Sequence, residues 1–192
     1  MTEEKHDESA LWELARRNDG AAFAELFDTH RGRVYRRALG LVDSTHDAED
    51  VTAAVFFELW RRRGSVRLAG GSVLPWLLVA AVNMSRNVHR STARYRRLVA
   101  TLPRAGSAPG PDLEHLDTRQ RLITSLRRLT PADSALFVLT VLEDVPLAQA
   151  AESLGLKPAT ARVRLHRARV RLRDELHDLN PNPRLAPKGS QQ

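Results

Sequence analysis

The chain has 192 residues, 42% of them hydrophobic and 28% charged, which fits one medium domain or two small ones of about 60–100 residues and excludes a large multi-domain enzyme. Lys and Arg number 30 against 23 Asp and Glu, so the formal net charge is +7, which favours a polyanionic partner such as nucleic acid or an anionic membrane. The absence of cysteine excludes disulfides, thiolate zinc sites, cysteine nucleophiles and thiol redox chemistry.

The pattern of apolar residues predicts an all-α protein. Apolar residues three and four positions apart are frequent, whereas the alternation typical of strands is hard to find. No window approaches about eighteen uninterrupted apolar residues, and Met1 is followed by polar and charged residues instead of a basic and then apolar leader. We therefore expect a soluble, cytoplasmic protein made of two small helical domains, with no membrane insertion.

Three helices are predicted in the first part of the chain. Residues 11–15 and 22–27 keep helical apolar spacing, and Asn18-Asp19-Gly20 breaks the chain between them. A third helix begins after Ser44, which can cap it, and Asp47 stands where it can close a capping box.

A fourth helix is predicted to follow the loop 64–72 and to begin near Pro75, since a first turn accepts proline. Its predicted buried stripe comprises Leu77, Ala80, Ala81, Met84 and Val88. Amides, an aromatic ring and cations, without any acid, occupy other positions: Trp76, Asn83, Arg86, Asn87, Arg90, Arg94, Arg96 and Arg97. Amides can hydrogen-bond an unstacked base, an aromatic ring can stack on it, and Arg can hold phosphates, so this surface suits single-stranded nucleic acid. Ordinary surface polarity for the amides, and a core position for Trp76, are equally open alternatives.

A composition break divides the chain. Residues 102–111 read LPRAGSAPGP, and these prolines and glycines cannot hold a helix. We therefore predict a first domain over 1–98, a flexible linker over 99–112, a second domain over 113–179 and a disordered tail over 180–192. Fully extended at ~3.3–3.6 Å per residue, the linker spans ~50 Å, which would let the two domains touch DNA sites more than one helical turn apart.

The second domain is predicted to contain a helix-turn-helix. Apolar spacing over 116–129 outlines one helix, and Thr130-Pro131-Ala132-Asp133 begins the next with a cap, a proline and an acid in the expected order. A short helix over 147–154 is ended by Gly155, and a longer one runs from Pro158 to about residue 176. Two helices joined by a short glycine turn are typical of a helix-turn-helix.

The last predicted helix has an apolar side and a basic side. The apolar side consists of Ala161, Leu165, Ala168 and Leu172. The other positions carry Thr160, Arg162, Val163, Arg164, His166, Arg167 and Arg171, and no acid occurs from Lys157 to Arg173. A recognition helix needs this division, because one face packs on its scaffold while N-terminal side chains reach base edges. The alternative is a solvated basic surface helix, but such helices usually mix Glu with Arg.

Four acids lie close together: Asp43, Asp47, Glu49 and Asp50, with His46 beside them. In isolation they could be metal ligands or general acid and base groups. Acids in a first helical turn also satisfy free amides and complement the helix dipole, which is the stronger interpretation. The sequence has no glycine-rich phosphate cradle and no nucleophile elbow. We therefore predict no catalytic residue, no metal site and no cofactor, and a protein that is not an enzyme.

Together these residues resemble the extracytoplasmic-function sigma factors, group IV of the sigma-70 family, which keep only the second and fourth sigma regions. Asp47-Ala48-Glu49-Asp50-Val51, with Val55-Phe56-Phe57 and Leu59-Trp60, looks like the region 2 helix that docks on the clamp of the largest polymerase subunit. The resemblance implies that polymerase is bound by Asp47, Glu49, Asp50, Phe56 and Trp60. Where the family usually has Gln followed by an acid, this chain has Ala53 and Ala54.

The resemblance extends to both promoter elements. Pro75-Trp76-Leu77-Leu78 and Ala81-Val82-Asn83, continuing to Arg90, look like the helix that melts and reads the minus-ten element. The resemblance implies that Asn83 and Asn87 contact a flipped base in a pocket formed largely by the loop 64–72. It also implies DNA contacts by Trp76, Arg86 and Arg90. Leu154-Gly155-Leu156 and the run 159–169 resemble the region 4 helix-turn-helix that binds the minus-thirty-five element. There the implied base contacts are Arg162, Val163, His166 and Arg167, with Thr160 and Arg164 on phosphates.

The resemblance implies an alternative sigma factor that directs core RNA polymerase to specific promoters. Its expected partners are the polymerase clamp, the flap of the second-largest subunit, promoter DNA and an anti-sigma factor. Two other hypotheses fit the residues: a helix-turn-helix regulator that binds duplex DNA without polymerase core, and an adaptor that sequesters a signalling partner.

Overall fold

The computed structural model describes residues 7–100 and 118–179, and describes side chains for 7–91 and 118–178. Every regular element in these ranges is helical, apart from one isolated bridge between Ala69 and Ser72. The predicted all-α class is confirmed. Among the described helices, none has both the length and the apolar composition that a membrane span requires.

Four helices form the first lobe: α1 (Glu8–Arg16), α2 (Gly20–Leu39), α3 (Thr45–Arg62) and α4 (Leu74–Ala100). Local capping sets their starts. Asp19 accepts hydrogen bonds from the backbone amides of Ala21 and Ala22, and Ser44 accepts one from the amide of Asp47. The helix boundaries predicted at these residues are confirmed. The core between the helices contains fully buried Trp12, Leu26, Val55, Leu59 and Leu77.

The second lobe consists of α5 (Thr118–Arg128), α6 (Pro131–Phe137) with the π-helical turn η2 (Val138–Leu142), α7 (Leu147–Ser153), α8 (Pro158–Glu175) and the short η3 (His177–Leu179). Thr130 caps α6 by accepting a hydrogen bond from the amide of Asp133. Gly155 has φ +64° between α7 and α8, a backbone conformation that glycine adopts without strain. The predicted helix-turn-helix is therefore confirmed as α7, a glycine turn and α8.

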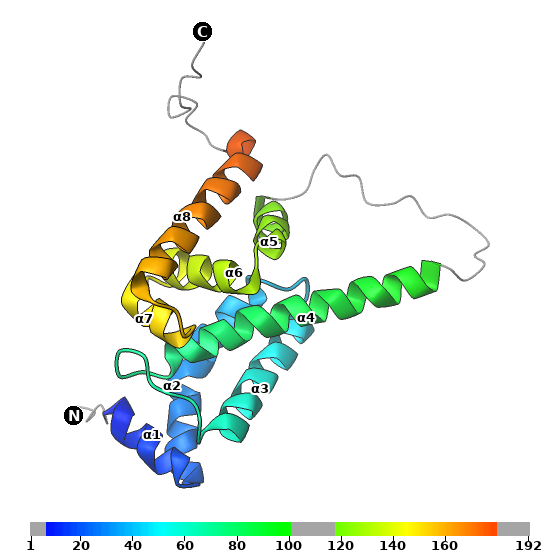
Figure 1. Cartoon of the computed structure of the whole chain (residues 1–192). Helices are drawn as coiled ribbons and strands as arrows, with labels where there is room; N and C mark the ends of the chain where they lie inside the picture. The colour runs from blue at the N-terminus through cyan, green and yellow to red at the C-terminus, as the bar shows by residue number, and fades with distance from the viewer. Residues whose placement is uncertain (1–6, 101–117, 180–192) are drawn as a thin grey trace, which may run out of the picture.

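The two lobes pack against each other through α4 (Figure 1). One face of α4 buries Leu77 and Ala81 against α1 to α3, as predicted. A second face buries Leu78 and Val82 against α6, α7 and α8, which the predicted stripe did not include. Each such leucine contributes roughly 1.5–3 kcal/mol when fully buried. Helix α4 thus contributes to the core of the first lobe and to two further apolar clusters that include residues of the second lobe.

The loop that precedes α4 also contacts the second lobe. Gly70 and Gly71 have φ +61° and +79°, a backbone conformation that glycine adopts without strain. A Cβ atom on Gly70 would overlap the end of the Gln149 side chain on α7. A larger residue there would have to displace that side chain and adopt a strained positive φ. The predicted linker 99–112 lies outside the described residues except for its first two positions, which end α4, and the predicted tail 180–192 lies outside them altogether.

Candidate nucleic-acid and protein interfaces

The basic helix α8 presents its predicted recognition residues to solvent. Its apolar side is buried at Ala161, Leu165, Ala168 and Leu172. The exposed positions are Thr160, Arg162, Val163, His166 and Arg167. No side chain of α8 before Asp174 is acidic, so this face attracts phosphates along its length. The geometry suits insertion of the N-terminal half of the helix into a major groove.

Arg164, predicted to contact a phosphate, is bonded to the scaffold of α8 in this structure. Its Nε donates a hydrogen bond to Oδ1 of Asp133 at 2.7 Å, and its terminal nitrogen lies 3.3 Å from Oγ1 of Thr130. Asp133 and Thr130 belong to the capped N-terminus of α6, so Arg164 joins the recognition helix to its scaffold. The sequence did show that α8 lacks acids, but the acid that pairs with Arg164 comes from a helix 31 residues earlier.

The exposed face of α4 carries Asn83, Asn87 and Arg90, as the helical spacing predicted. Trp76 is half-buried and packs against the core of the first lobe, which favours the core alternative for this ring. The side chains of Arg94, Arg96 and Arg97 lie outside the described residues. The two amides and one cation therefore form the part of the predicted minus-ten surface that is open to solvent.

Arg86 does not lie on that exposed face. Its guanidinium donates hydrogen bonds to the carbonyl oxygens of Leu126, Arg127 and Leu129, at 3.0, 3.0 and 2.9 Å. It thereby satisfies free carbonyls at the C-terminus of α5, where a cation also complements the helix dipole. Burial, with a smaller effect from the positive charge of Arg90, lowers the pKa of Arg86. In this arrangement of the lobes its donors are bound to these carbonyl oxygens, so a contact between Arg86 and DNA stays a prediction that requires the bonds to open.

Glu8, which the sequence did not single out, holds the loop in front of α4. Its Oε1 accepts hydrogen bonds from the amide of Val73 at 2.7 Å and from Oγ of Ser72 at 2.9 Å, and lies 3.0 Å from Nε2 of His30. Burial acts to raise the pKa of Glu8, but the hydrogen bonds from His30, Val73 and Ser72 together outweigh it and the pKa is lowered. Glu8, near the start of the first lobe in sequence, thus holds the last residues of the loop that is predicted to form the base pocket.

On α3, the predicted polymerase-binding acids are accessible. Glu49 and Asp50 are exposed and Asp47 is partly so. Phe56, predicted with them, is only 3% exposed and forms an edge-to-face pair with Phe27, with ring centroids 4.7 Å apart. Its ring packs mainly in the core, although it also lines the groove between α2 and α3. Its contact with polymerase stays a prediction.

The ring that follows Phe56 in the sequence is the exposed one. Phe57 is 68% exposed and lies four residues after Ala53, so helical spacing could have placed it on the solvent face. An open groove of about 490 Å³ between α2 and α3 is lined by Gly20, Phe23, Phe27, Ala53, Phe56, Phe57 and Trp60. Trp60 packs edge-to-face on Phe23, and the guanidinium of Arg63 covers its ring at 4.2 Å. Exposed aromatic surface in a groove is typical of a protein-binding site.

Besides the apolar contacts of α4, ion pairs between α2 and the residue that follows η2 connect the two lobes. Glu143, after η2, is buried and pairs with two arginines of α2: Arg33 Nε lies 2.7 Å from Oε2, and Arg37 Nε lies 2.5 Å from Oε1. The same guanidinium groups donate to the carbonyl oxygens of Glu143 and Leu142. We call Glu143, Arg33 and Arg37 the latch.

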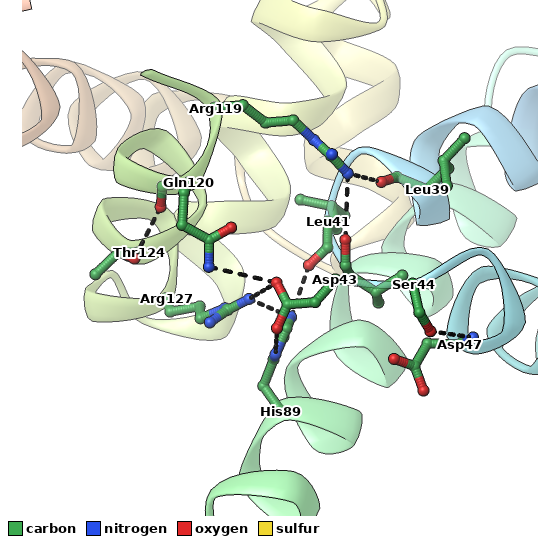
Figure 2. Close-up of polar contacts among 11 residues, drawn as sticks. Leu39, Leu41, Asp43, Ser44, Asp47, His89, Arg119, Gln120, Thr124 and Arg127 are labelled. Carbon is green, nitrogen blue, oxygen red and sulfur yellow. Dashed lines mark hydrogen bonds and ion pairs between the residues drawn. The ribbon is translucent and has the colours of Figure 1, made fainter. Parts of the chain in front are cut away.

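A polar cluster lies at the α3, α4 and α5 junction (Figure 2). Asp43 lies 3.4 Å from Nδ1 of His89 and 3.7 Å from a terminal nitrogen of Arg127. Arg119 donates to the carbonyl oxygens of Leu39 and Val42. In the part of the chain that the structure describes, no group of three or more His, Asp or Glu residues could hold a metal ion.

Comparison with known proteins follows the same two-lobe division. The family model "Sigma-70 region 2" matches residues 26–95, and "Sigma-70, region 4" matches residues 113–172. The chain is 31% identical over 171 residues to the RNA polymerase sigma factor CarQ of Myxococcus xanthus, covering 86% of this chain and 97% of CarQ. It is 30% identical over 173 residues to the ECF RNA polymerase sigma factor SigL of Mycobacterium tuberculosis, covering 85% and 97%.

Two solved structures share the fold. CnrH in complex with the cytosolic domain of CnrY aligns with a TM-score of 0.60 and 21% identity, over 91% of this chain and 99% of CnrH. The sigma factor RpoE in complex with the anti-sigma factor NepR from Bartonella quintana aligns with a TM-score of 0.53 and 20% identity, over 81% and 96%.

Proposed function

The chain belongs to the sigma-70 family of RNA polymerase sigma factors, in its extracytoplasmic-function group. From this premise we propose which surface of the chain binds each promoter element and which binds the polymerase. As a member of this family, it is an alternative sigma factor that directs core RNA polymerase to promoters. The observation that carries the assignment of surfaces is the exposed, acid-free face of α8 in a helix-turn-helix whose opposite side is buried.

The α8 face is the proposed reader of the minus-thirty-five element. We propose that base edges are contacted by Arg162, Val163, His166 and Arg167, and that Thr160 contacts a phosphate; their exposure supports this proposal. Arg164 is proposed to act through its bond to Asp133, which sets the angle of α8 on α6. It is therefore a positioning residue for the base-reading side chains.

The exposed face of α4 is the proposed reader of the minus-ten element. Asn83 and Asn87 offer amide groups to an unstacked base, Arg90 offers a cation to the backbone, and the loop 64–72 supplies the wall of the pocket. Arg86 reaches DNA only if it leaves the α5 carbonyl oxygens. We propose that the lobes separate when the protein works, so that the two promoter surfaces can engage distant elements jointly.

The acidic start of α3 and the aromatic groove are the proposed contact with the polymerase clamp. Asp47, Glu49 and Asp50 supply negative charge, and Phe57 and Trp60 supply apolar surface beside it. The second lobe is proposed to contact the flap of the second-largest subunit, by resemblance to the family. The chain contributes binding surfaces in this proposal, with no reaction catalysed by its own residues.

We further propose an anti-sigma factor as a regulatory partner. Two solved proteins of the same fold are complexes, RpoE with the anti-sigma factor NepR and CnrH with the cytosolic domain of CnrY. Because RNA polymerase and promoter DNA are the other partners, the proposed place of action is the cytoplasm.

Run-off transcription with purified core polymerase tests the proposed function. Promoter-specific transcripts are expected only when this chain is added. Duplex binding by the chain alone, with no specific initiation in the presence of core, would favour the alternative of a conventional helix-turn-helix regulator.

Replacing Asn83 with Ala tests the minus-ten assignment. The variant should form closed complexes normally and open promoter DNA poorly, measured by permanganate reactivity of unpaired thymines. Ser91→Ala is a matched control, because Ser91 is an exposed polar residue two turns further along the same helix. Equal promoter opening by both variants would contradict the role of Asn83.

A further inference from the structure

A basic hollow lies where α4 of the first lobe meets α5 of the second. It has a volume of about 270 Å³ and is lined by Arg86, His89 and Arg90 from α4 and by Arg127 from α5. All four lining residues carry cationic or basic side chains. We call it the interlobe basic pocket.

The positive charge of this pocket is only partly balanced. Asp43 is the carboxylate that contacts the cluster, at 3.4 Å from His89 and 3.7 Å from Arg127. Of the three guanidinium groups, only that of Arg127 has a carboxylate contact among the described residues, and Arg86 is bonded to neutral carbonyl oxygens. Burial lowers the pKa of Arg127; Asp43 acts against that shift, and the charge of Arg86 adds to it. Like charges held this close repel each other, and an added anion would relieve that repulsion.

The geometry of the pocket is held in place before any ligand arrives. Three bonds to neutral carbonyl oxygens fix the guanidinium of Arg86 without neutralising it. Arg127 is held between Asp43 and His89, and its buried Nε–H finds no hydrogen-bond acceptor within the described residues. Arg90 is exposed at the rim. Rigid guanidinium groups with unused donors favour a multivalent oxyanion, because the planar fork of Arg matches phosphate oxygens.

We propose that the interlobe basic pocket binds the phosphate or diphosphate group of a small solute, and that the bound anion holds the two lobes together. The walls come from both lobes, so the complete pocket exists only while they are packed. A ligand that binds this arrangement and not the separated one shifts the equilibrium toward it by mass action. Phosphates of single-stranded DNA share the same chemistry and are the other source that an experiment must separate.

Titration calorimetry of the full chain with pyrophosphate at low ionic strength tests the proposal. Saturable binding of one pyrophosphate per chain is expected. Arg127→Gln and Arg90→Gln should each weaken it by about tenfold, which is the loss of one charge-assisted contact. Arg173→Gln is the matched control with the same charge change, because Arg173 is exposed in the last turn of α8. It should alter the affinity by less than about twofold.

The arrangement of the lobes gives a second readout. Pyrophosphate should stabilise the packed form, seen as a higher urea midpoint for loss of energy transfer between dyes on the two lobes. Arg127→Gln also removes a contact to Asp43, so a change in lobe packing could have two causes. Arg90→Gln is the decisive variant, because within the described residues Arg90 makes no hydrogen bond between the lobes. Its affinity should fall while the small-angle scattering profile without ligand stays that of wild type.

Three results would overturn the proposal. The first is no saturable pyrophosphate binding. The second is equal weakening by Arg90→Gln and Arg173→Gln, which would indicate diffuse charge. The third is binding of a short single-stranded oligonucleotide that depends on Arg90 and Arg127 while pyrophosphate does not bind, which would make the pocket part of the DNA surface alone.

Discussion

The latch gives a direct test of whether the packed lobes depend on a few charged contacts. Replacing Glu143 with Gln keeps the volume of the side chain and removes its charge. The Glu143 side chain is 7% exposed, while its partners Arg37 and Arg33 are 17% and 41% exposed. The substitution therefore leaves one mostly buried guanidinium without its counter-charge, and a second that water reaches more easily.

The expected loss is about 2–4 kcal/mol in the free energy that holds the lobes together. A hydrogen bond to a charged group is worth roughly 1.5–3 kcal/mol, and Glu143 accepts one from each arginine. Exposure of Arg33 reduces its share through solvent screening, and the Gln oxygen still accepts one bond. At about 1.4 kcal/mol per factor of ten, the ratio of packed to separated molecules should fall about 30- to 700-fold.

Energy transfer between two dyes measures this ratio. The chain has no cysteine, so Ala24→Cys on α2 and Arg173→Cys on α8 place one dye on each lobe at exposed positions. Urea should abolish energy transfer at a lower concentration in Glu143→Gln than in wild type, with the shift converted to free energy by linear extrapolation. Glu152→Gln, an exposed acid on α7 with the same charge change, is the control. Equal midpoints for the two variants and wild type, with unchanged helical content, would refute the reasoning.

Three further predictions concern Arg164, Glu8 and the two neighbouring phenylalanines of α3. Arg164→Ala should weaken minus-thirty-five binding without changing which bases are preferred, whereas Arg167→Ala should also relax base preference; binding to a panel of single-base promoter variants separates the two effects, and equal relaxation would contradict the positioning role of Arg164. The pKa of Glu8 is lowered on folding, so Glu8 stabilises the protein above the ordinary pKa range of glutamate and this contribution is lost as pH falls through its folded pKa. Urea unfolding from pH 7 to pH 3 should therefore show a smaller loss of stability in Glu8→Gln than in wild type, and parallel curves would argue against the bonds seen here. Phe56→Ala should cost about 3–5 kcal/mol of folding stability, as expected for a buried ring, whereas Phe57→Ala should leave thermal unfolding nearly unchanged and weaken binding to core polymerase; unchanged affinity would remove Phe57 from that interface.

The local elements of this fold could be predicted because their signals lie within a few residues of each other. Ser44 and Thr130 cap the helices that follow them, and Gly155 allows the turn between α7 and α8. The buried side of α8 follows from helical spacing alone. These features depend on short-range sterics and hydrogen bonding, which a linear pattern records directly.

The roles of individual charged residues were decided by tertiary packing. Arg86 and Arg90 are one helical turn apart and look alike in sequence, yet Arg86 is bound to carbonyl oxygens at least 40 residues away and Arg90 is open to solvent. The same holds for Glu143, whose partners lie more than 100 residues earlier.

The sequence alone determined the helices, the turn between α7 and α8 and the family. Only the tertiary structure decided that α4 has two buried faces and that a basic pocket lies between the lobes. The physical reason is that burial and charge pairing depend on which surfaces meet in space, and segments so far apart in sequence leave no local pattern from which that meeting could be predicted.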